Sequence, residues 1–184
     1  MASSDREHIT AAQHGDRAAL ESLFSLYLTS VYRFVYRIVG NATDADDTTQ
    51  ETFVKAWRAL GKFDVEKNFL PWVLRIAKHT ALDFMKKKNP VAFSTLTVPE
   101  ENALRDAIID HEPLPDALID TEFTRAQVQE FVQTLPIPQQ TVLFLHYQEQ
   151  LTFQEIADIL EESIDTVKTR HRRAVMQLRR GISE

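Results

Sequence analysis

The chain has 184 residues, with 21 Lys and Arg against 27 Asp and Glu, and a formal net charge of −6. Its hydrophobic share of 43% and charged share of 26% are ordinary for a globular protein, and the length suits one domain or two small ones. The absence of cysteine excludes disulfides and zinc–thiolate sites, and no segment predicts a signal peptide or a transmembrane helix. Taken as a sum, the acidic charge argues against a nucleic-acid partner.

Residues 18–88 predict a helical domain, and residues 1–17 predict a tail that leads into its first helix. Apolar side chains recur every three or four positions across residues 20–38, which is the stripe of an amphipathic helix. Gly40 and Asn41 tolerate the left-handed conformation in which many helices end, so this helix is expected to end there.

The next helix is predicted to begin at Thr43 or Asp44 and to end at Gly61. Asp46 and Asp47 are expected in its first turn, where the helix dipole favours anions. The apolar positions of this helix are Phe53, Val54, Trp57 and Leu60.

A third helix is predicted from about Pro71 to Lys88, because proline suits the first turn of a helix. Aromatic and basic side chains alternate around the loop before it. This combination serves single-stranded nucleic acids, since bases stack on rings and cations follow phosphates. We predict that Trp57 and Trp72 are core residues, because both lie on apolar stripes, whereas Phe63 in its loop fits either the core or base stacking.

Residues 89–119 differ in composition from the segments on either side. They carry one basic and six acidic side chains and hold four of the seven prolines of the chain. Because proline resists continuous helix, this stretch predicts a linker, within which a short helix over residues 101–109 is left open.

Residues 120–184 predict a second helical domain that contains a helix-turn-helix. Thr152 and Glu155 have the spacing of a capping box, which opens a helix over residues 153–160. A supporting helix, opened by the prolines in residues 136–138, precedes it in the chain.

The helix after Ser163, which is its candidate cap, is strongly basic. Residues 166–180 hold six Lys and Arg and no Asp or Glu, whereas solvated helices mix both signs. In a helix-turn-helix the second helix enters the major groove, where arginine bonds guanine and lysine or threonine reaches base or phosphate. We therefore predict DNA binding by the outer face, which presents Lys168, Thr169, Arg172 and Arg173.

Several stretches resemble the motifs of one protein family. Residues 44–60, DADDTTQETFVKAWRAL, together with residues 72–77 and 81–83, resemble region 2 of bacterial sigma factors. Residues 151–157, LTFQEIA, and residues 166–170, TVKTR, resemble region 4. With these two regions and a short linker, the chain is similar to the extracytoplasmic-function (ECF, group 4) class of the sigma-70 family.

The resemblance implies that the first domain docks on the β′ clamp helices of RNA polymerase and melts the −10 promoter element. The implied clamp contacts are Asp46, Asp47, Gln50 and Glu51. A flipped −10 base would be held in a pocket formed by Ala59, Phe63, Asn68, Phe69, Lys78, His79 and Thr80.

For the second domain, the resemblance implies that it reads the −35 element and binds the β flap. The implied DNA contacts are Lys168, Thr169, Arg172, Arg173, Thr166 and His146. The linker would thread toward the polymerase active site, and an anti-sigma factor would cover the polymerase-binding surfaces. The family is cytoplasmic, and it implies no cofactor, metal, small-molecule substrate or membrane insertion.

Two other functions are weighed against this one. A stand-alone helix-turn-helix regulator, whose N-terminal helices bind a ligand or dimerise, would bind a specific duplex without polymerase. A hydrolase or metal enzyme is disfavoured, because the six histidines lack zinc-like spacing, and neither a glycine-rich phosphate loop nor a nucleophile elbow occurs. No catalytic residues are therefore predicted.

Overall fold

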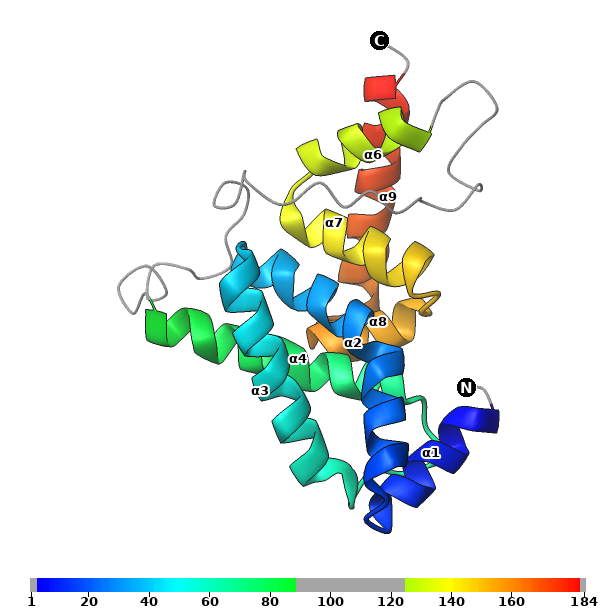
Figure 1. Ribbon diagram of the computed structural model, residues 1–184. Coiled ribbons are helices and arrows are strands. Elements are labelled where there is room, and N and C mark those ends of the chain that lie inside the picture. Colours follow the sequence, from blue (N-terminus) through cyan, green and yellow to red (C-terminus); the bar gives the residue numbers. More distant parts are fainter. Residues whose placement is uncertain (1–2, 89–124, 183–184) are drawn as a thin grey trace. The chain divides into compact units, whose positions relative to one another are not determined.

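The computed structural model describes residues 3–88 and 125–182, and every regular element in these ranges is helical (Figure 1). The predicted all-α fold class is thus confirmed. The chain divides into two compact units, Met1–Thr95 and Leu96–Glu184. The predicted linker of residues 89–119, with the helix left open inside it, lies outside the described residues.

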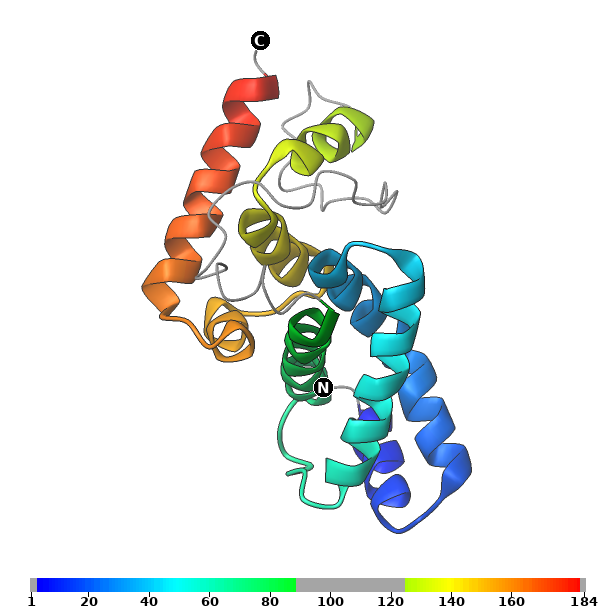
Figure 2. The same ribbon diagram turned by 90° about the vertical axis from the view of Figure 1, so that its left-hand side faces the viewer.

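The first unit is a bundle in which one long helix contacts all the others (Figure 2). Its described helices are α1 (Ser3–Gln13), α2 (Arg17–Val39), α3 (Ala42–Leu60) and α4 (Phe69–Lys88). The long helix α2 packs against α1, α3 and α4, and α3 also packs against α4. Each helix places at least one side chain in the core, as shown by Ile9, Leu23, Phe34, Leu60 and Leu74, which are fully buried or nearly so.

The helix α1 lies in the segment that the sequence predicts to be a tail. Ile9 is fully buried and Ala12 nearly so, and both belong to the core side of this helix. At its start, the Tyr27 hydroxyl donates a hydrogen bond of 3.0 Å to Asp5 Oδ2. Burial, followed by this bond, raises the pKa of Tyr27. These contacts hold α1 against α2.

Two caps determine the boundary between α2 and α3. Gly40 ends α2 with a φ of 82°, and its N–H donates to the Tyr36 carbonyl at 2.8 Å. Asn41 then caps α3, because its side-chain oxygen accepts the N–H of Asp44 at 2.9 Å. The helix therefore begins at Ala42, ahead of the predicted start, and its first turn contains Asp44. The two aspartates predicted for that turn lie in the following turn.

The second unit packs its shorter helices around α9. Its described elements are α6 (Arg125–Thr134), α7 (Ile137–Leu143), the π-helical turn η2 (Phe144–Gln148), α8 (Phe153–Leu160) and α9 (Ile164–Ile182). The helices α6, α7 and α8 all contact α9. One hydrophobic cluster of this unit contains the buried side chains Leu135, Leu143, Ala174 and Leu178.

The helix-turn-helix formed by α8 and α9 has the predicted caps. Thr152 Oγ1 accepts the N–H of Glu155 at 3.2 Å, and the Thr152 N–H donates to the Glu155 carboxylate at 2.9 Å. The turn passes through Glu161 in the left-handed conformation, with a φ of 56°. Ser163 Oγ then accepts the N–H of Thr166 at 3.1 Å, which starts α9. The capping box and the Ser163 cap are confirmed.

The supporting helix changes character near its end, which the sequence does not predict. After α7 the chain widens into η2, where the N–H of Glu149 donates to the carbonyl of Phe144, five residues back, at 3.2 Å. A π-helical turn rotates the following side chains relative to an unbroken α-helix. His146 and Tyr147 lie within this turn.

Candidate polymerase and nucleic-acid interfaces

The outer face of α3 brings the four implied clamp contacts together with two apolar side chains. An α-helix advances about 100° per residue, so eight exposed positions of α3 fall within one arc of about 140°. They are Thr43, Asp46, Asp47, Gln50, Glu51, Val54, Trp57 and Arg58. We name this arc the outer face of α3. It combines an acidic part with an apolar part, and Arg58 adjoins the apolar part.

The sequence predicts Trp57 for the core, and this prediction is wrong, because its side chain is 58% exposed. Val54, another apolar position of the helix, is 43% exposed. The core side of the same helix is filled by Phe53, Ala56 and Leu60. Tryptophan is enriched at protein interfaces, because its large ring releases much water when a partner covers it. The two exposed side chains therefore extend the acidic positions into a mixed acidic and apolar surface.

The loop between α3 and α4, residues 61–68, lies above an aromatic cluster. The rings of Phe63, Phe69 and Trp72 contact one another at centroid distances of 4.8 to 5.7 Å. Trp72 is partly buried, whereas Phe63 and Phe69 are 7% and 1% exposed. Two of the implied base-pocket rings therefore support the loop from inside and present no open face for stacking.

Thr80 is also internal. Its side chain is buried, and its hydroxyl donates to the carbonyl of Ile76 at 2.9 Å. The hydroxyl is thus engaged within α4.

The remaining implied −10 residues separate into two groups. Asn68 is exposed at the end of the loop, and Ala59 is partly exposed in the last turn of α3. Lys78, partly exposed, and His79, exposed, lie on α4. His79 follows the first residue of α4 by ten positions, which is about 15 Å along the helix axis. The structure therefore does not bring His79 into the loop group.

The outer face of α9 carries the predicted DNA contacts. Lys168, Arg172 and Arg173 are exposed, and Thr169 is partly exposed. On an ideal helix these four positions share an arc of about 140°, so the structure brings them together. Val167, on the other side of α9, is fully buried. We name these four side chains the basic face of α9.

Two neighbours of the basic face make contacts at the turn. Thr166 is exposed, but its hydroxyl lies 2.8 Å from the Ser163 hydroxyl and belongs to the helix cap. Arg170 forms an ion pair with Glu162 at 2.5 Å, which ties α9 back to the turn. Arg170 thus has a structural partner inside the unit.

His146 lies inside the helix-turn-helix and not on the basic face. Its Nδ1 is 2.9 Å from the Leu151 carbonyl, and its ring stacks on Phe153 at a centroid distance of 4.5 Å. The His171 ring lies 5.2 Å away, and its Nε2 is 3.0 Å from the Tyr147 hydroxyl. These side chains connect η2, α8 and α9. The Nδ1 of His146 is thus engaged within the unit, and the implied DNA contact of this residue stays a prediction.

Comparison with known proteins identifies the family. Residues 23–90 match the family Sigma-70 region 2, and residues 125–178 match the family Sigma-70, region 4. The chain is 30% identical to the ECF RNA polymerase sigma factor SigW of Bacillus subtilis over 182 residues, which cover 97% of each chain. The chain belongs to the ECF class of the sigma-70 family. As a sigma factor, it directs core RNA polymerase to promoters and starts transcription.

Further relatives agree with this assignment. The RNA polymerase sigma-H factor of Pseudomonas aeruginosa is 31% identical, over 92% of this chain and 89% of the relative. Among solved structures, CnrH in complex with the cytosolic domain of CnrY has a TM-score of 0.63 at 22% identity, covering 98% of this chain and 97% of that chain. RpoE in complex with the anti-sigma factor NepR from Bartonella quintana has a TM-score of 0.62 at 20% identity, covering 89% and 96%. Both structures share the fold of this ECF sigma factor.

The sigma-70 family to which the chain belongs is a family of non-enzymatic transcription initiation factors. Within residues 3–88 and 125–182, no three His, Asp or Glu side chains are arranged to hold a metal ion. None of the helices in these ranges combines the length and the apolar character that a membrane crossing needs.

Removing the Phe63 ring from this sigma factor is expected to unfold region 2 more easily. Phe63→Ala would leave a cavity between Phe69 and Trp72, and such truncations of buried rings cost about 3–5 kcal/mol. Urea unfolding followed by tryptophan fluorescence measures this, because the Trp72 ring lies 4.8 Å from Phe63. Phe63→Leu, which keeps most of the volume, is the control. If Phe63→Ala kept its stability but lost promoter opening, Phe63 would instead contact DNA directly.

Region 4 of this sigma factor is expected to lose stability as the pH falls below about 6.5. Burial, followed by the charge of His146, holds the pKa of His171 below its ordinary value. The unfolded chain therefore takes up a proton at a higher pH than the folded domain, which favours unfolding in acid. An NMR titration of the ring protons of His171, assigned with His171→Gln, checks the direction. A midpoint above 6.5 would contradict it.

Proposed function

We propose that the two units of this sigma factor divide promoter recognition between them. Region 4 reads the −35 element through the basic face of α9. Region 2 binds the β′ clamp helices through the outer face of α3 and holds a −10 base at the α3–α4 loop. The proposal rests above all on α9, where exposed Lys168, Arg172 and Arg173 lie on one side of the second helix of a helix-turn-helix.

For the polymerase contact, charge and apolar character act together. The acidic part of the outer face of α3 suits the basic side chains that the family resemblance implies on the clamp helices. Trp57 and Val54 supply the apolar part, which releases water on docking. The β flap is proposed as the partner of region 4 on family grounds.

For the −10 element, we propose a direct role for the four surface residues. Asn68 at the end of the loop offers an amide that both donates to and accepts from a base edge. Lys78 and His79 on α4 follow the strand beyond that base, and Ala59 leaves room beside it. The buried side chains Phe63, Phe69 and Thr80 determine the shape of the loop from beneath.

Regulation by an anti-sigma factor is proposed from the relatives. RpoE was solved with the anti-sigma factor NepR, and CnrH with the cytosolic domain of CnrY. Such a partner would cover the surfaces that bind polymerase. We infer cytoplasmic action, alongside the transcription machinery, with no catalytic residue or cofactor in this chain.

Run-off transcription with core polymerase, followed by sequencing of the promoters used, tests the proposed function. The sigma factor is expected to bind promoter duplex weakly alone and to give specific transcripts only with core enzyme. Tight binding to a specific duplex without polymerase, together with failure to join core enzyme, would instead support the stand-alone regulator.

A further inference from the structure

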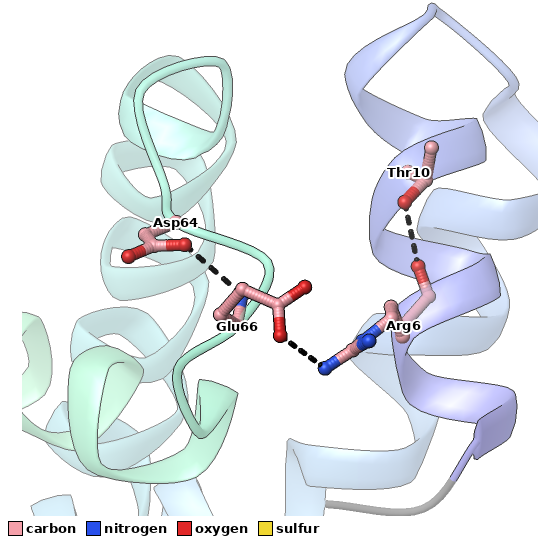
Figure 3. A network of polar contacts seen from close by, with 4 residues as sticks. All are labelled: Arg6, Thr10, Asp64 and Glu66. Atoms are coloured by element: carbon pink, nitrogen blue, oxygen red, sulfur yellow. Dashed lines mark hydrogen bonds and ion pairs between the residues drawn. The ribbon is translucent and has the colours of Figure 1, made fainter.

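The helix α1 reaches across to the α3–α4 loop through two side chains. Gln13, the last residue of α1, donates both N–H groups of its side-chain amide, to the Leu60 carbonyl at 3.0 Å and to the Phe63 carbonyl at 2.8 Å. Near the start of the helix, the Arg6 guanidinium contacts the Glu66 carboxylate at 2.6 Å (Figure 3). The loop is therefore attached to α1 at its beginning and near its middle.

The Gln13 contacts lie where α3 ends. Leu60 is the last residue of α3, and its carbonyl also accepts the N–H of Phe63 at 2.9 Å. The Gln13 side-chain amide, which has two donors, adds a second bond to this carbonyl and bonds that of Phe63 as well. Since the Phe63 ring is buried against Trp72, the backbone and the side chain of this residue are both held. The first half of the loop is thus fixed by α1 on one side and α4 on the other.

The Arg6 contact acts on a loop that is already folded locally. Asp64 Oδ1 accepts the N–H of Glu66 at 3.0 Å, which forms an Asx turn (Figure 3). Arg6 and Glu66 are both largely exposed, so this ion pair contributes little stability by itself. It instead favours one orientation of the turn relative to α1. Gln13 is accordingly the stronger attachment and Arg6 the weaker.

The helix α1, which supports the loop, is itself fixed in the bundle. Ile9, between the two attachment points, is fully buried, and Asp5 is held by the Tyr27 hydroxyl. A loop anchored to such a support loses less conformational freedom when it closes on a ligand. The contacts of α1 therefore pre-organise the segment that precedes Asn68.

We propose that α1 is a positioning element for −10 recognition, and that Gln13, assisted by Arg6, holds the α3–α4 loop in the conformation that receives the flipped base. This inference rests on the proposed role of the loop in binding that base. It gives the N-terminal helix a part in promoter selectivity without any contact to DNA. Gln13 and Arg6 are thus positioning residues.

The test measures base preference at the −10 element with complete holoenzyme. Transcription is compared on promoters that carry each of the four bases at each −10 position. Gln13→Met, which keeps the length but removes both donors, is expected to reduce the preference at the flipped base about tenfold. Its affinity for core enzyme and its −35 preference are expected to stay unchanged. Glu7→Gln, at an exposed position of the same helix, is the matched control.

A charge exchange keeps the proposal testable even where Gln13→Met folds poorly. Arg6→Glu and Glu66→Arg are each expected to weaken the preference, and the double variant to restore it, because the exposed pair is re-formed with reversed charges. Unchanged preference in Gln13→Met and in both single variants would overturn the inference. A separate result would be that Asn68→Ala leaves the −10 base preference of the wild type unchanged. In that case the proposed function of the loop itself fails.

Discussion

Replacing Trp57 with alanine is expected to weaken binding of this sigma factor to core RNA polymerase by about 2 kcal/mol or more, which is about 30-fold in Kd. The indole is 58% exposed in the free protein and lies on the outer face of α3, C-terminal to its acidic part. A ring in this setting loses its water when the clamp covers it. Aromatic anchors of this kind carry much of the binding free energy at protein interfaces, while the charges around them guide association.

Equilibrium binding of labelled sigma factor to core enzyme measures this effect, and urea unfolding provides the control. Because Trp57 is exposed, the alanine variant is expected to unfold within about 0.5 kcal/mol of the wild type, with Trp72 as the remaining fluorophore. Trp57→Phe should retain most of the affinity, since a phenyl ring still releases water on docking. Equal affinity of the wild type and Trp57→Ala would remove this ring from the interface.

The position of Trp57 shows how far apolar spacing predicts a helix face. Its spacing from Phe53 fits a helical stripe, yet only Phe53 faces the core. The core side of α3 is completed by threonines, of which Thr52 is fully buried and donates its hydroxyl to the Thr48 carbonyl at 2.8 Å. Burying a hydroxyl costs little free energy when the hydroxyl is hydrogen-bonded within its own helix. A prediction that ranks residues by hydrophobicity alone therefore places Trp57 on the core side of α3 in error.

Elements with local signals were predictable, and elements that depend on distant partners were not. The helix α8 follows from the Thr152–Glu155 capping box, and α2 follows from its apolar stripe and Gly40. The helix α1 has few large apolar residues and depends on burial of Ile9 against the bundle. The π-helical turn η2 likewise has no sequence signal.

The same distinction holds for the candidate sites. Charge and spacing predict the basic face of α9, because both are properties of one helix. The α3–α4 loop is different, because the burial of Phe63 and Phe69 depends on contacts between the loop, α4 and α2. Its attachment to Gln13 spans 47 to 50 positions in the chain. No local pattern reports such contacts.

Replacing Arg172 or Arg173 with alanine is expected to cost about 1–3 kcal/mol in −35 binding, together with a relaxed preference at one base pair. Both side chains are exposed on the basic face of α9. Bidentate bonding to a guanine edge produces such a localised loss, because the other bases lack the matching pair of acceptors. Holoenzyme binding to a library of −35 variants measures both the affinity and the preference.

Arg170, a neighbouring arginine of α9, provides the matched control. Arg170→Ala removes the same charge from the same helix, but its guanidinium is held by Glu162 at 2.5 Å. A loss shared by all three variants therefore reports the general attraction between α9 and DNA. The excess at Arg172 or Arg173, confined to particular bases, reports direct reading. A uniform loss across all −35 sequences, with the salt dependence of binding reduced by about one unit of slope, would instead assign that arginine to a phosphate.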